Sequence, residues 1–65
     1  MSAKLKQQIL VHLAEQPMSL SEIAGKMELK EKRTFKLLRS LFQKDEIRMV
    51  RSEDGIRRYA RNDEA

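Results

Sequence analysis

Hydrophobic residues at the start of the chain repeat with the period of an α-helix. Leu5, Ile9 and Leu13 are four residues apart, and this spacing predicts a helix over about residues 4–15. Pro17 follows, and the residue before a proline is displaced from helical backbone angles. The first helix is therefore expected to end just before this proline.

A second helix is predicted directly after it. Ser19 and Glu22 have the spacing of a capping box, in which the serine hydroxyl and the glutamate carboxylate each accept a hydrogen bond from a backbone amide at the start of the helix. Met18 and Ile23 flank them at the positions of a hydrophobic staple. The helix is expected to end at a short turn over residues 28–30.

A third helix is predicted over about residues 31–44, with one apolar and one basic side. At about 100° per residue, the apolar side consists of Thr34, Leu37, Leu38, Leu41 and Phe42, with Phe35 at its edge. The other side consists of Lys32, Lys36, Arg39, Ser40 and Gln43, with Arg33 beside them. We expect the apolar side, with both phenylalanines, to be buried, and the basic side to be exposed.

The pattern then changes to one typical of strands. Residues 47–51 and 56–60 are rich in β-branched, aromatic and arginine residues, which predicts a two-stranded hairpin. Asp54 and Gly55 stand between them, and this pair is favoured in hairpin turns because both residues tolerate a positive φ. Tyr59 is expected to pack the hairpin onto the third helix.

The predicted fold class is α+β, with three helices followed by a two-stranded antiparallel hairpin. The 65 residues are enough for one domain, which we expect to span residues 1–65 with an ordered core of about 4–61. Because the chain begins with Met1, we expect a complete small protein. There is no cysteine, so neither disulfides nor thiolate zinc ligands contribute to its stability.

Charge is distributed unevenly along the chain. The net charge is +4, and it comes entirely from the second half, since residues 1–29 are neutral and residues 30–65 carry eleven basic and seven acidic groups. Such asymmetry favours a polyanionic partner, although an ordinary solvated surface is the plainer interpretation.

Catalysis, metal binding and membrane insertion are not expected. No glycine-rich phosphate loop, nucleophile motif or cluster of metal ligands is present, and His12 has no evident partner. We therefore expect no enzyme activity and no cofactor. The first apolar run is too short for a signal peptide or a membrane span, which favours a cytoplasmic protein.

The order of these elements resembles that of winged helix-turn-helix DNA-binding proteins over nearly the whole chain. The helix-turn-helix unit of that family corresponds to about residues 20–39. The positions where it has apolar or small residues hold Ile23, Ala24, Met27, Leu29, Thr34 and Leu37. Glu28 is a departure, because that turn position is often glycine. In size and layout the chain is similar to small bacterial fimbrial-operon regulators of the PapI/FaeA type.

The resemblance implies that the third helix enters the major groove of double-stranded DNA and that the hairpin is the wing. The basic side agrees, because lysine and arginine reach guanine or phosphate from a helix in that groove. On the helix, we expect groove contacts from Lys32, Arg33 and Lys36, phosphate contacts from Lys30 and Arg39, and Ser40 beside them. On the wing, we expect contacts to the backbone or minor groove from Arg48, Arg51, Arg57, Arg58 and Arg61.

Two further points follow for the site. Backbone amides near residues 19–21, at the start of the second helix, are candidates for holding a phosphate. Arg57 and Arg58 point to opposite faces of a strand, so at most one of them shares a face with Arg51. The plainer interpretation of the wing arginines is protection of an edge strand against aggregation.

Other functions remain as alternatives to a transcriptional regulator that binds duplex DNA. RNA or single-stranded nucleic acid is disfavoured, because readers of single strands expose aromatic residues and those of this chain are expected to be buried. A protein-interaction module, or an accessory subunit of a larger regulatory complex, is the main alternative. It would expose an apolar patch, at Phe35, Met49 or Val50, instead of a continuous positive surface. Self-association or a partner regulator is compatible with either function.

Overall fold

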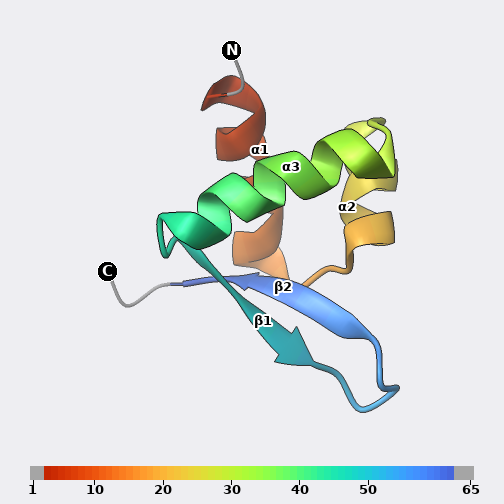
Figure 1. Ribbon diagram of the computed structural model, residues 1–65. Coiled ribbons are helices and arrows are strands. Elements are labelled where there is room, and N and C mark those ends of the chain that lie inside the picture. Colours follow the sequence, from red (N-terminus) through yellow and green to blue (C-terminus); the bar gives the residue numbers. More distant parts are fainter. Residues whose placement is uncertain (1–2, 63–65) are drawn as a thin grey trace.

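The chain forms three helices and a two-stranded hairpin in the predicted order. The structure is a computed structural model, and it describes residues 3–62. The elements are α1 (Ala3–Glu15), α2 (Leu20–Met27), α3 (Glu31–Gln43), β1 (Ile47–Arg51) and β2 (Arg57–Arg61). In Figure 1, α3 crosses in front of α1, and the hairpin extends below the helices. The fold class is therefore confirmed, and β2 begins one residue later than expected.

The predicted capping box starts α2. The Glu22 backbone N–H donates to Ser19 Oγ over 3.2 Å, and the Ser19 backbone N–H donates to Glu22 Oε1 over 2.8 Å. Met18 and Ile23, the residues of the predicted staple, are both buried in the core. These local interactions fix where α2 begins.

The end of α2 depends on an unusual backbone conformation at Glu28. This residue has a φ of 56°, in the left-handed region that glycine usually occupies at such a position. The Leu29 N–H donates to the Ala24 carbonyl over 2.9 Å, and the Glu28 N–H donates to the Gly25 carbonyl over 3.3 Å. This pair of bonds is a Schellman motif, so the tight turn forms despite the absence of glycine.

A single residue joins the hairpin to the connection between α1 and α2. The Met18 N–H donates to the Tyr59 carbonyl over 3.0 Å, and the Tyr59 N–H donates to the Met18 carbonyl over 2.7 Å. Met18 therefore pairs with β2 as a third strand would, and this contact holds the hairpin against the helices.

The core lies where the three helices and the start of β1 meet. It consists of Ile9, Leu13, Met18, Ile23, Leu37, Leu38, Leu41 and Ile47. Thr34 is fully buried, and its hydroxyl donates to the Lys30 carbonyl over 3.0 Å, so its polar atom is satisfied. Tyr59 packs against the core with part of its side chain, as predicted.

The prediction for the two phenylalanines of α3 was wrong. Phe35 is 49% exposed and Phe42 is 48% exposed. Leu38 and Leu41 of the same helix are buried in the core, so the buried side of α3 ends before these two rings.

The hairpin turn also differs from the prediction. Arg51 pairs with Arg57, so residues 52–56 form a five-residue loop and Ile56 lies outside the strand. In this loop only Gly55 has a positive φ, of 82°. Asp54 contributes through its side chain instead, because its Oδ1 accepts a hydrogen bond from the Ile56 N–H over 3.0 Å.

Candidate nucleic-acid interface

Burial of one side of α3 determines which of its side chains reach solvent. Thr34, Leu37, Leu38 and Leu41 are buried, and this fixes the rotation of the helix. Lys32, Lys36 and Arg39 then lie within about 60° of one another on the opposite side. All three are exposed, so the predicted basic side is a surface of the folded chain.

The cations at the start of α3 gather into one group. Lys30, Lys32, Arg33 and Lys36 line the same shallow hollow. Lys30 is the N-cap residue, with an extended backbone and no capping bond from its side chain, so its ammonium group extends from the point where the helix begins. No acidic side chain lines this hollow.

Ser40 lies at the edge of this basic side, next to α1. Its hydroxyl accepts a hydrogen bond from Lys6 Nζ over 2.6 Å, and the side chain is only partly exposed. From its angle around the helix, Ser40 is expected among the DNA contacts. The structure gives it an intramolecular partner on α1, which the helical pattern does not reveal.

The pairing of β1 with β2 divides the hairpin arginines between two faces. Arg51 and Arg57 are paired directly, and so are Met49 and Tyr59, so these four side chains share a face. Met49 and Tyr59 line a cleft against α3, so this is the face on the α3 side. Arg48 and Arg58 belong to the opposite face, because they alternate with the first set.

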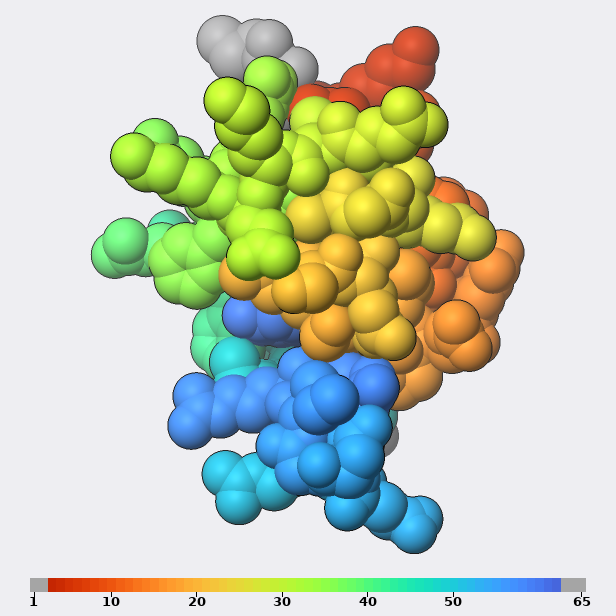
Figure 2. All heavy atoms as spheres, turned by 90° about the vertical axis from the view of Figure 1, so that its right-hand side faces the viewer, coloured from red at the N-terminus to blue at the C-terminus, as the bar shows by residue number. Residues whose placement is uncertain are grey.

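Seen from the side, the two basic elements project in one direction. In Figure 2, side chains of α3 (green) and of the hairpin (blue) extend to the left, whereas α1 (red to orange) lies to the right. Arg51 and Arg57 are both exposed. α3 and one face of the hairpin therefore border the same side of the molecule. Met49 lines one hollow with Arg39 and a neighbouring one with Arg51 and Arg57, which links the cations of the two elements.

Arg58 is different, because its guanidinium group bridges two carboxylates. Its Nε is 3.2 Å from Glu22 Oε1, and its Nη1 is 3.1 Å from each carboxylate oxygen of Asp54. The side chain is 19% exposed. From the sequence Arg58 is expected to contact DNA, whereas in the structure this arginine connects the hairpin to the start of α2.

These bonds shift the pKa values of all three groups. The pKa of Glu22 is lowered, mainly by the hydrogen bond from the Ser19 N–H and next by the one from Arg58. The pKa of Asp54 is lowered by the Ile56 N–H and by Arg58. The pKa of Arg58 is raised, first by its bond to Asp54. Each partner stabilises the charged form of the other.

The start of α2 is less open to a phosphate than expected. The Ser19 N–H and the Glu22 N–H are both used within the capping box. The carboxylate of Glu22 also places a negative charge there, which repels an anion. The phosphate site near residues 19–21 stays a prediction, with the Ser19 amide already used in the capping box.

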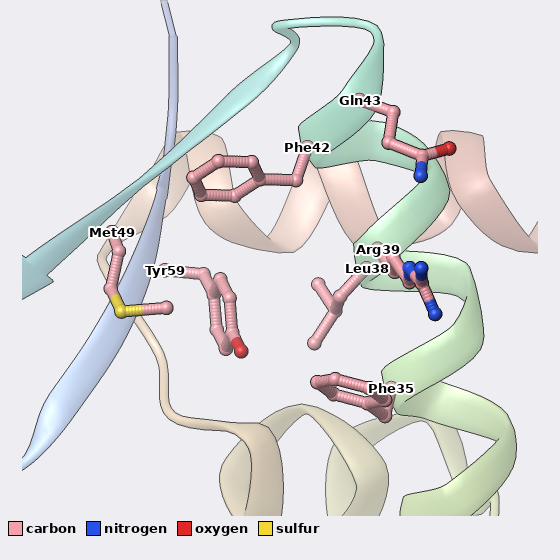
Figure 3. Close-up of a pocket in the computed structure, with 7 residues that line it drawn as sticks. All are labelled: Phe35, Leu38, Arg39, Phe42, Gln43, Met49 and Tyr59. Atoms are coloured by element: carbon pink, nitrogen blue, oxygen red, sulfur yellow. The ribbon is translucent and has the colours of Figure 1, made fainter.

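An apolar cleft separates α3 from the hairpin. It has a volume of about 330 Å³, and its lining residues are Phe35, Leu38, Arg39, Phe42, Gln43, Met49 and Tyr59. Figure 3 shows the apolar side chains of α3 facing Met49 and Tyr59 across an open space. Phe35, Met49 and Val50 are the residues expected to be exposed in a protein-interaction module. Phe35 and Met49 are exposed, whereas Val50 is half-buried.

Neither a membrane-spanning helix nor a group of potential metal ligands occurs among the described residues. No helix in residues 3–62 has both the length and the apolar character needed to cross a membrane. In the same residues, no three histidine or acidic side chains are grouped in a way that would hold a metal ion.

Comparison with solved structures places this arrangement among known folds. A mutant of ZitR from Lactococcus lactis has a similar structure, with a TM-score of 0.86 and 24% sequence identity. The fold is a winged helix-turn-helix. The match covers 92% of this chain and 42% of the ZitR chain, so this chain spans less than half the length of that protein. No family model and no curated protein matches the sequence.

Proposed function

We propose that this winged-helix protein binds double-stranded DNA and acts as a small transcriptional regulator. In this proposal, α3 enters the major groove with Lys32, Arg33 and Lys36, while Lys30 and Arg39 bind phosphates. The observation that carries the proposal is that α3 and one face of the hairpin border the same side of the molecule, together with the absence of acidic residues from the lining of the hollow at the start of α3. Polyanions bind to such surfaces.

Within the wing, Arg51 and Arg57 are the proposed contacts to the DNA backbone or minor groove. They lie on the hairpin face nearest α3, and both are exposed. Arg48 is exposed on the other face of the hairpin. It can contact the same duplex only if the DNA extends around the edge of the hairpin to that face. Arg58 contributes indirectly, because its bond to Glu22 fixes the hairpin relative to α2, whereas its bond to Asp54 lies within the hairpin.

The narrower assignments remain predictions. These are the likeness to fimbrial-operon regulators of the PapI/FaeA type, the cytoplasmic location and the partner regulator. The fold shared with the ZitR chain supports the proposal that this chain is a regulator.

The proposal is tested by fluorescence anisotropy with a labelled random-sequence duplex. We expect the triple variant Lys32→Gln/Arg33→Gln/Lys36→Gln to lose binding with its circular dichroism unchanged, because all three side chains are exposed. The matched control is Lys4→Gln/Lys26→Gln/Lys44→Gln, which removes the same charge from exposed positions elsewhere. Equal loss in both triple variants would show that net charge alone drives binding, and it would contradict the assignment of α3 as the recognition helix.

A further inference from the structure

The cleft between α3 and the hairpin is an apolar surface without a covering element. Phe35, Phe42 and Met49 are 49%, 48% and 43% exposed, and all three line it. Soluble proteins rarely leave such side chains side by side at the surface unless the patch binds something. In the described residues 3–62, no segment folds over this cleft.

Positive charge borders the cleft on both sides. Arg39 stands on the α3 side, and no carboxylate is among the lining residues. Met49 also lines a neighbouring hollow with Arg51 and Arg57, so the cleft continues directly to these two arginines. The surface therefore combines an apolar floor with cations along two borders.

This charge pattern discriminates between possible occupants. A second copy of the chain docked symmetrically would place arginines against arginines, which is unfavourable. DNA phosphates fit the arginines, and a duplex can bridge the two borders of the cleft. Its backbone cannot fill the apolar floor, however, because a phosphate placed there would lose hydration without gaining hydrogen bonds. An occupant with apolar side chains for the floor and carboxylates for the borders satisfies both parts of the surface.

We propose that this cleft binds an acidic amphipathic helix of a partner protein. Amphipathic helices place residues i, i+3 or i+4 and i+7 in an apolar groove. Here such residues would contact Phe35, Phe42 and Met49, while flanking glutamates or aspartates pair with Arg39, Arg51 and Arg57. Because these arginines also belong to the proposed DNA surface, the helix and DNA compete for the protein. The competition rests on the proposed function, but binding of the helix does not.

The first experiment titrates the ¹⁵N-labelled full chain with synthetic peptides and follows its amide spectrum by NMR. The probe is a helix-forming peptide with leucines at i, i+3, i+4 and i+7 and glutamates on its flanks. One control peptide has lysines in place of the glutamates, and another has serines in place of the leucines. We expect shifts at residues of the cleft with the first peptide, and binding at least about tenfold weaker with either control.

Variants then locate the binding site. Phe42→Ser and the pair Arg51→Gln/Arg57→Gln should each weaken binding of the acidic peptide about tenfold. Neither change touches the buried core cluster, so the spectra should remain those of a folded protein. The matched controls are Val11→Ser and the pair Lys4→Gln/Lys26→Gln, which alter an exposed apolar residue and two exposed cations away from the cleft, and they should leave affinity unchanged.

Other outcomes would overturn the proposal. If the lysine peptide bound as tightly as the glutamate peptide, the arginines beside the cleft would not select an acidic partner, and the proposal would be wrong. A chain that sediments as a dimer and becomes monomeric with Phe42→Ser would identify a second copy as the occupant. Shifts at Phe42 and Met49 with a DNA duplex, and none with the acidic peptide, would assign the cleft to DNA. A protein that binds the acidic peptide but no DNA would support the cleft site and refute the proposed function.

Discussion

At the scale of single residues, backbone conformation decides how tightly α2 and α3 are joined. Glu28 has a φ of 56° and Asp45 has a φ of 62°, and each follows the end of a helix. For residues with a Cβ this region costs about 1–2 kcal/mol, and aspartate tolerates it better than glutamate does. Glu28 therefore holds a strained conformation between the two helices of the helix-turn-helix unit.

Replacing Glu28 by glycine should relieve this strain. We expect Glu28→Gly to raise the free energy of unfolding by about 1 kcal/mol, because glycine adopts a positive φ without a Cβ clash. For a domain of this size, that corresponds to a Tm higher by about 5 °C in a thermal melt followed by circular dichroism. Glu28→Gln keeps the Cβ and removes the charge, so an equal rise in that variant would show that charge, not φ, is responsible.

At the scale of elements, Arg58 connects the hairpin to α2 across 36 residues of sequence. The strand pairing fixes Arg51 and Arg57 on one face, and the bonds of Arg58 to Glu22 and Asp54 hold that strand and its loop against α2. The hairpin would otherwise be held to the helices mainly by the Met18–Tyr59 pairing and the packing of Ile47. Orientation of the wing therefore depends on an exposed cluster of charges.

This cluster should make stability depend on pH in the acid range. The pKa values of Glu22 and Asp54 are both lowered in the folded state, so folding favours the ionised forms. Their contribution is present above the ordinary carboxyl pKa of about 4 and is lost as the pH falls through the lowered values. We expect Arg58→Gln to have a lower Tm than the wild type at pH 7, and the difference to shrink below about pH 4. A difference that stays constant down to pH 2 would contradict the role of the two carboxylates.

At the scale of the whole molecule, the proposed DNA surface consists of cations from two separate elements. α3 and the pair Arg51 and Arg57 border the same side, and the apolar cleft, which Arg39 of α3 lines, lies next to these two arginines. A duplex that reaches both elements spans the cleft, and a helix seated in the cleft blocks this contact. The same geometry thus supports both the proposed binding of DNA and its proposed inhibition by a partner helix.

Contact with both elements should appear in the salt dependence of DNA binding. If about five phosphates are neutralised, the slope of log K against log salt should be roughly −4 to −5. Arg51→Gln/Arg57→Gln should make the slope less steep by about one to two and should weaken binding to all sequences alike. The measurement is a set of anisotropy titrations at several salt concentrations, with Lys26→Gln as control. An unchanged slope in the double variant, or a change of sequence preference alone, would contradict the role given to the wing.

Much of the fold followed from the sequence because its signals are local. The capping box at Ser19 and Glu22, the proline after α1 and the apolar repeat of α3 each act within a few residues of the chain. They were sufficient to predict the order of the elements and their limits to within one or two residues. The exposed basic side of α3 followed in the same way, because burying one side of a helix exposes the other.

Only the tertiary structure decided which surface residues have partners. Phe42 lies at the boundary of the apolar side, and its exposure depends on how far the hairpin extends over α3. Arg58 and Ser40 resemble their neighbours in the sequence, yet Glu22 and Lys6, far away in the chain, bind them. Helical and strand periods specify the direction of a side chain, whereas its partners depend on the packing of whole elements, which no local pattern encodes.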